Sequence, residues 1–182
     1  MNRPTLLHRK EADFLTWLNV LHYRGIEVYG TAFEMHHYPR KTLYQLYVYS
    51  WGTTDMITFT GLHPCKGILL TNTLEDCNLL YLLKPFFPLP QQYPSRSVQE
   101  VRSFMSKGCR LIPDPLTAPI YCLDELGTEV ELYLPKTNDE YFINLLQQRH
   151  RNRLLTHATS SMPLRDLRKK YGDVLDQLFN VL

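Results

Sequence analysis

The chain has 182 residues, enough for one domain with a single buried core. Its hydrophobic share of 44% and charged share of 21% are those of an ordinary globular protein, which excludes a disordered chain. The formal net charge of +2 is too small to indicate nucleic-acid binding by itself.

The sequence shows no secretory or membrane-spanning pattern. Residues 1–10 lack the apolar core of a signal peptide, and the longest apolar run, 78–89, is interrupted by Lys84 and Pro85. None of the cysteines forms a C-x-x-C pair, so we expect reduced and mostly buried thiols. They are Cys65, Cys77, Cys109 and Cys122. We therefore expect an intracellular protein without membrane contact, in the cytoplasm or nucleus, or in the host cell if it is viral.

The first predicted element is an amphipathic helix over residues 11–23. Apolar residues from Phe14 to Leu21 recur at spacings of three and four, which places them on one helical face. Gly25 stands where a left-handed residue would close the helix. The apolar stripe is suited to cover one face of a sheet.

The stretch 27–61 is rich in Tyr, Val, Phe, Thr and Trp, which favour strands. Breaks at 39–41 and 52–55 divide it into three predicted strands of a meander. A helix packed on an antiparallel meander is an α+β arrangement.

The middle of the chain alternates short elements and loops. We expect a short strand at 68–71, a helix at 74–83 and a helix that Ser95 or Ser97 caps and Gly108 ends. The proline-rich segment 85–94 is a candidate boundary or docking segment.

The last third begins with a predicted hairpin over 120–135. A capping pattern at 137–140 then opens a helix to about Leu155, residues 157–161 form a linker, and a final helix covers 163–182. The sequence thus predicts one α+β domain over 1–182, with an antiparallel sheet of meander plus hairpin flanked by amphipathic helices.

The final predicted helix has a wide apolar face. It either docks on its own domain or binds a partner, which includes a second copy of the chain. The candidate partner-binding residues are Leu167, Tyr171, Val174, Leu175 and Leu178.

Basic residues are concentrated between 147 and 170, opposed there by Asp166, whereas residues 114–140 are mostly acidic. The basic group is a candidate phosphate-contacting surface, or its charge complements the acidic segment within the molecule. Its members are Arg149, Arg151, Arg153, Arg165, Arg168, Lys169 and Lys170.

Three carboxylates give an enzymatic alternative. Asp114, Glu129 and Glu131 resemble the acidic part of a PD-(D/E)xK nuclease site, which would take Mg²⁺ or Mn²⁺. Glu131 stands where that site has its lysine, however, and the two glutamates also fit the solvent face of an amphipathic strand.

Two other groups of potential metal ligands do not form a convincing site. His36 and His37 are adjacent and point to opposite faces of a strand, although Glu34 and His36 share a face. The spacing of His63, Cys65, Cys77 and Cys109 matches no standard zinc motif, so we predict no metal site.

We therefore predict a non-catalytic protein that binds another macromolecule and requires no cofactor. The partner is a protein or a second copy bound through 163–182, or nucleic acid bound through the basic residues. The alternative is the divalent-metal-dependent nuclease.

Overall fold

The computed structural model describes the chain in two compact units. The described residues are 14–31, 33–51, 54–71, 79–84, 93–106, 113–128 and 138–182. The helical unit comprises Met1–Pro64 and Tyr81–Gln92, and the sheet unit comprises Cys65–Leu80 and Tyr93–Leu182. The prediction of a single domain over 1–182 stays a prediction, and residues 85–92 of the proline-rich segment lie outside the described residues.

The helical unit is built from helices where strands were predicted. Its elements are α1 (Phe14–Tyr29), the 3₁₀ helix η1 (Met35–His37), α2 (Arg40–Trp51), α3 (Thr54–Phe59) and the last residues of α4 (Leu79–Leu83). The three-strand meander is therefore wrong. In α2 the buried Leu43, Leu46 and Ser50 are three and four residues apart, which is a helical spacing, and it outweighs the strand preference of the surrounding tyrosines.

Helix α1 confirms the first predicted helix but extends six residues further. Gly25 is buried inside it, and a Cβ there would lie 2.0 Å from the Phe33 ring. Gly25 thus permits close packing of Phe33, whereas Gly30, with φ of +83°, takes the left-handed conformation after the helix ends.

The sheet unit contains a five-stranded sheet in which every pairing is parallel. Its strands are β1 (Gly67–Thr71), β2 (Ser95–Ser97), β3 (Ile120–Asp124), β4 (Leu155–Ser160) and β5 (Phe179–Val181), in the order β2-β3-β4-β1-β5. The fold is α/β, and the predicted antiparallel sheet is wrong. In the predicted hairpin, β3 pairs in parallel with β2 and β4, while residues 129–135 of the return strand lie outside the described residues.

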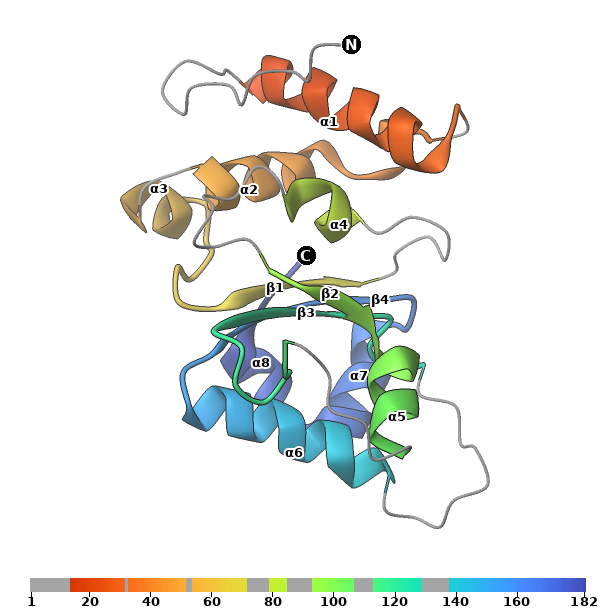
Figure 1. Ribbon diagram of the computed structural model, residues 1–182. Helices are drawn as coiled ribbons and strands as arrows, with labels where there is room; N and C mark the ends of the chain where they lie inside the picture. Colours follow the sequence, from red (N-terminus) through yellow and green to blue (C-terminus); the bar gives the residue numbers. More distant parts are fainter. Residues whose placement is uncertain are drawn as a thin grey trace. The chain divides into compact units, whose positions relative to one another are not determined.

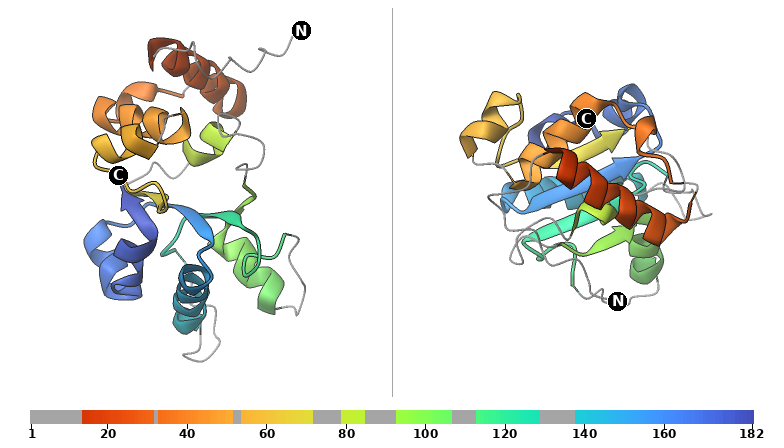
Figure 2. Two further views of the ribbon diagram at one scale, coloured as in Figure 1. Left: turned by 90° about the vertical axis from the view of Figure 1, so that its left-hand side faces the viewer. Right: turned by 90° about the horizontal axis from the view of Figure 1, so that it is seen from above.

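Helices cover one face of this sheet (Figures 1 and 2). They are α5 (Val98–Ser106), α6 (Asn138–Arg151), α7 (Leu164–Tyr171) and α8 (Val174–Leu178). The crossovers from β2 to β3, β3 to β4 and β4 to β5 all progress in one direction across the sheet. Because such crossovers are right-handed, their helices fall on the same face. The core between these layers includes Leu69, Leu123, Phe142, Leu146 and Leu175.

Strand β4 lies at the centre of the sheet, where a linker was predicted. It contains few apolar residues, and its polar side chains are nevertheless buried: Thr156, His157, Thr159 and Ser160. Parallel strands buried on both faces are usually apolar runs, as β1 and β3 are. The polar composition of β4 therefore gave the wrong signal.

The predicted C-terminal helix over 163–182 is also divided. Helix α7 ends at Gly172, whose φ is +65°, and α8 and then β5 follow. The five candidate partner-binding residues belong to the core of the sheet unit. Their apolar face is covered by the chain's own sheet unit.

Strands β1 and β4 approach each other unusually closely. A Cβ at Gly67 would lie 1.5 Å from the Thr156 carbonyl oxygen, so this position requires glycine. The next residue, Ile68, donates its N–H to Nδ1 of the buried His157 at 3.1 Å. The ring of Tyr93 lies 4.7 Å from that of His157. Because Nδ1 accepts a hydrogen bond, the neutral ring carries its proton on Nε2.

The neutral state of His157 makes stability depend on pH. Burial, aided by the charge of Arg149, lowers the pKa of His157 from 6.5 to about 3. Between these values the unfolded chain binds a proton that the folded chain excludes. The free energy of unfolding should therefore fall by about 1.4 kcal/mol for each pH unit below 6.5.

Urea unfolding between pH 7 and pH 5 measures this dependence. His157→Gln should be less stable at pH 7 but should lose less stability on acidification, because it has no titrating ring. Parallel stability curves for the two proteins would show that His157 does not carry the effect.

Candidate nucleic-acid interface

The carboxyl end of α6 is the basic end of the helix. Its last turn contains Arg149, His150 and Arg151, which complement the negative end of the helix dipole. The N–H of Arg153 then bonds to the His150 carbonyl at 3.0 Å, and Arg153 adopts a φ of 54°. This turn leads directly into β4, so the helix end is fixed against the sheet.

Arg149 points into the protein and is completely buried. Its Nε donates to the Thr156 hydroxyl at 2.8 Å, and its Nη2 donates to the Leu155 carbonyl at 2.7 Å. Its Nη1 donates to the carbonyls of Ala118, at 3.1 Å, and Pro115. Burial lowers the pKa of Arg149 to about 10, so it stays charged at neutral pH. Arg149 therefore joins α6 to β4 and to the loop before β3, away from any external phosphate.

The neighbouring cations have the opposite orientation. His150, Arg151 and Arg153 are all exposed. Within the described ranges, no carboxylate lies within ion-pair distance of Arg151 or Arg153. These two arginines are therefore positive groups at the surface that the described carboxylates do not compensate.

The cations of α7 are compensated by the protein itself. Asp166 lies 3.5 Å from Arg165 and 3.3 Å from Lys169, and Asp176 lies 2.8 Å from Arg168. The hydrogen bond and the charge of Asp176 raise the pKa of Arg168.

The remaining cation of α7, Lys170, donates to the Gly127 carbonyl at 3.2 Å, and its Nζ lies 5.7 Å from the centre of the Tyr171 ring. The predicted basic group thus divides into a buried arginine, a compensated set on α7 and an exposed set at the end of α6.

A pocket of about 410 Å³ borders the exposed set. This volume lies in the lower range of small-ligand pockets, about 300–1,000 Å³. Residues from the end of α6, from the α7–α8 corner and from α8 line it, among them Gln147, His150, Arg151, Gly172, Asp173 and Gln177. Two amides, a carboxylate and a guanidinium can thus reach one bound molecule. The sequence gave no signal for this pocket, because the two segments that form it are about twenty residues apart.

The carboxyl ends of the strands are the usual ligand site of an open α/β sheet. Here the described polar groups bond to one another. The Thr159 hydroxyl donates to the Asp124 carboxylate and accepts the Glu125 N–H at 3.1 Å. The Ser160 hydroxyl donates to the Leu126 carbonyl at 2.5 Å. These hydrogen bonds stabilise the carboxyl ends of β3 and β4, and we propose no ligand site there.

Of the three predicted nuclease residues, the structure describes Asp114 alone. The Asp114 carboxylate accepts the Leu116 N–H at 2.8 Å and so stabilises the turn before β3. Glu129 and Glu131 lie outside the described residues, so the nuclease stays a prediction. Among the residues the structure describes, no three His, Cys, Asp or Glu side chains are placed to hold a metal ion.

The other predicted ligand groups are partly described. His36 Nε2 lies 3.1 Å from Glu34 Oε2 at the surface, so these two residues are in contact. Cys65 is exposed and Cys122 is buried, while Cys77 and Cys109 lie outside the described residues.

Comparisons with protein-family models, with curated proteins and with solved structures each found no match to this chain. Within the described ranges, no helix combines the length and apolar character that crossing a bilayer requires. The residues of the candidate site, and not the fold alone, indicate the function.

Two neighbouring arginines should differ in their effect on stability. Arg149→Met leaves several buried acceptors without a donor and should lower the free energy of unfolding by about 3 kcal/mol. Arg151→Met makes the same substitution at an exposed position. Its free energy of unfolding should stay within about 0.5 kcal/mol of that of the parent protein. Urea unfolding at pH 7 measures both, and equal small effects would contradict the structural role of Arg149.

Proposed function

We propose that this protein binds nucleic acid through the exposed cations at the end of α6. Arg151 and Arg153 contact phosphate groups, and His150 lies between them in sequence. The observation that carries the proposal is their exposure without a carboxylate partner in the described part of the chain. Cations of this kind supply the electrostatic part of nucleic-acid binding.

The pocket beside these cations supports the same proposal. Gln147 and Gln177 each offer an amide donor and acceptor, and Asp173 offers an acceptor. Such groups form hydrogen bonds with sugars and with the edges of unpaired bases. Arg151 belongs to both the pocket and the exposed set, so one ligand can meet a phosphate contact and the amides together.

The cations of α7 contribute less to the proposed binding of nucleic acid. A phosphate that approaches Arg165 or Lys169 competes with Asp166, and one that approaches Arg168 competes with Asp176. These contacts therefore add less to affinity than those of the exposed set.

A protein partner bound through 163–182 has little support, since the residues proposed to contact it form the core of the sheet unit. We therefore propose nucleic acid, and not a protein, as the macromolecule that this chain binds.

Fluorescence anisotropy with labelled single- and double-stranded DNA and RNA tests the proposal. The logarithm of the affinity should fall linearly with the logarithm of the salt concentration. The double variant Arg151→Gln/Arg153→Gln loses two phosphate contacts, so the salt dependence of its binding to duplex DNA should be less steep. The magnitude of the slope should fall by about 1.8, which is about 0.9 per contact.

Arg165→Gln is the matched control, because its side chain is 81% exposed but paired with Asp166. It should change the slope much less than the double variant. Absence of binding to all four nucleic acids at low salt would overturn the proposal. An unchanged slope in the double variant would show that the end of α6 does not contact the nucleic acid.

A further inference from the structure

We infer that the helical unit carries a second nucleic-acid surface, at the amino end of α2, and that this surface selects single strands. The inference rests on the proposed function in that the ligand is nucleic acid. It uses other residues, however, and they belong to the other compact unit.

The first element of this surface is a pair of cations in an unfavourable place. Arg40 and Lys41 open α2 directly after Pro39, both are exposed, and the first turn contains no acidic residue. The amino end of a helix is already positive, so carboxylates usually occupy it. In the described part of the chain, no carboxylate lies within ion-pair distance of either residue. An anionic ligand would pair with these two cations.

The second element is an aromatic group that extends from the core to the surface. Phe14 and Trp17 come from α1, and Tyr44 and Tyr47 come from α2. Trp17 is completely buried, whereas Tyr44 is 44% exposed. The Tyr44 ring lies 5.3 Å from Phe14, nearly perpendicular to it, and 6.1 Å from Tyr47. Phe14 and Tyr47 thus pack against the partly exposed ring of Tyr44 and hold it in place.

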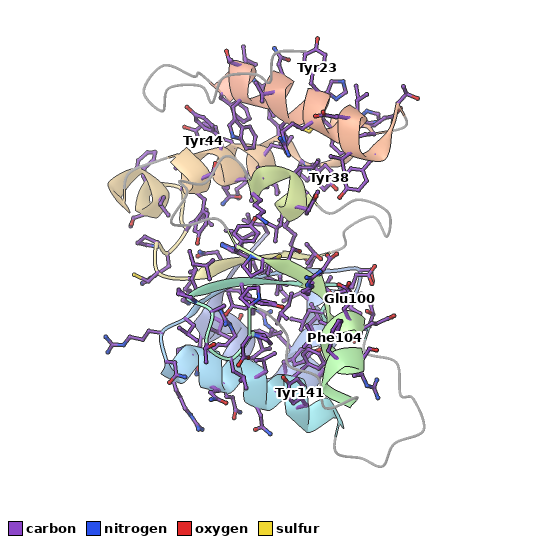
Figure 3. The ribbon with its side chains drawn as sticks, in the orientation of Figure 1. Tyr23, Tyr38, Tyr44, Glu100, Phe104 and Tyr141 are labelled. Carbon is purple, nitrogen blue, oxygen red and sulfur yellow. The ribbon has the colours of Figure 1, made fainter. Side chains whose placement is uncertain are left out.

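The two elements adjoin. The Arg40 guanidinium lies 6.0 Å from the centre of the Phe14 ring, and Phe14 is in contact with Tyr44. Tyr44 follows Arg40 by four residues, so both lie on one face of α2. Figure 3 shows Tyr44 on α2, while Tyr23 extends from α1 on the side away from α2.

Cations beside a supported, exposed aromatic ring fit a single strand. Phosphates bind the cations, and an unpaired base stacks on the ring. The bases of a duplex are already stacked on one another and do not offer a face to Tyr44. The aromatic contact therefore separates single strands from duplexes, whereas the cations attract both.

The test compares an oligothymidylate of about 20 nucleotides with a duplex of the same length, by fluorescence anisotropy. Tyr44→Leu should weaken binding of the single strand about tenfold and change duplex binding less than about twofold. Tyr44→Phe keeps the ring and should bind like the parent protein. Tyr23→Leu is the control for loss of an exposed tyrosine, since Tyr23 is 72% exposed and lies outside the aromatic group. It should leave both affinities unchanged.

The cations are tested by salt dependence. Arg40→Gln/Lys41→Gln should make the salt dependence of single-strand binding less steep. The magnitude of the slope should fall by about 1.4, which is about 0.7 for each lost phosphate contact. An unchanged slope would exclude these two residues from the surface.

The outcomes separate this inference from the proposed function. If the parent protein binds and only the Arg151/Arg153 variant is weakened, the second surface is overturned and the proposed function stands. If only the Tyr44 and Arg40/Lys41 variants are weakened, the second surface stands and the α6 interface is overturned. If the parent protein binds neither probe, both are overturned.

Discussion

The sheet unit depends on the close pairing of β4 with β1. Gly67 has no side chain where the Thr156 carbonyl passes, and the ring of His157 accepts a hydrogen bond from the Ile68 backbone. A backbone donor at the start of β1 is thereby satisfied by a side chain. A buried N–H without a partner would destabilise the sheet, so the neutral ring of His157 takes the place of a backbone acceptor. Strand β3 pairs with the other edge of β4, and β5 pairs with the other edge of β1.

The candidate interface follows from how α6 enters this central strand. Successive residues of a helix point about 100° apart, so Arg149 and Arg151, two positions apart, lie on opposite faces of α6. Arg153 follows the end of the helix, in a left-handed turn. Arg149 faces the sheet and bonds to the first residues of β4, which fixes the end of the helix. Arg151 and Arg153 then face solvent at a position that the buried arginine determines. One basic segment thus supplies both a structural contact and the proposed binding group.

Local signals predicted the elements whose sequence pattern agrees with their surroundings. Ser97, one of the two predicted caps of α5, exchanges two hydrogen bonds with Glu100, both at 3.1 Å, and β1 is an apolar run. Helix α2 was missed because its tyrosines and valine favour strands, while its burial follows a helical period. Strand β4 was missed because its buried hydroxyls and histidine are satisfied by partners distant in sequence. The pocket is formed by tertiary contacts, so no local pattern predicts it.

The position of the α6 end depends on residues 155–160 forming the middle strand of a parallel sheet. Backbone nuclear Overhauser effects measured by NMR test it most directly. We expect contacts from Ala158 to both Leu69 and Leu123, which are its partners in the two neighbouring strands. A segment without contacts to either neighbour, or one with antiparallel contacts, would contradict the fold and the position of the α6 end that follows from it.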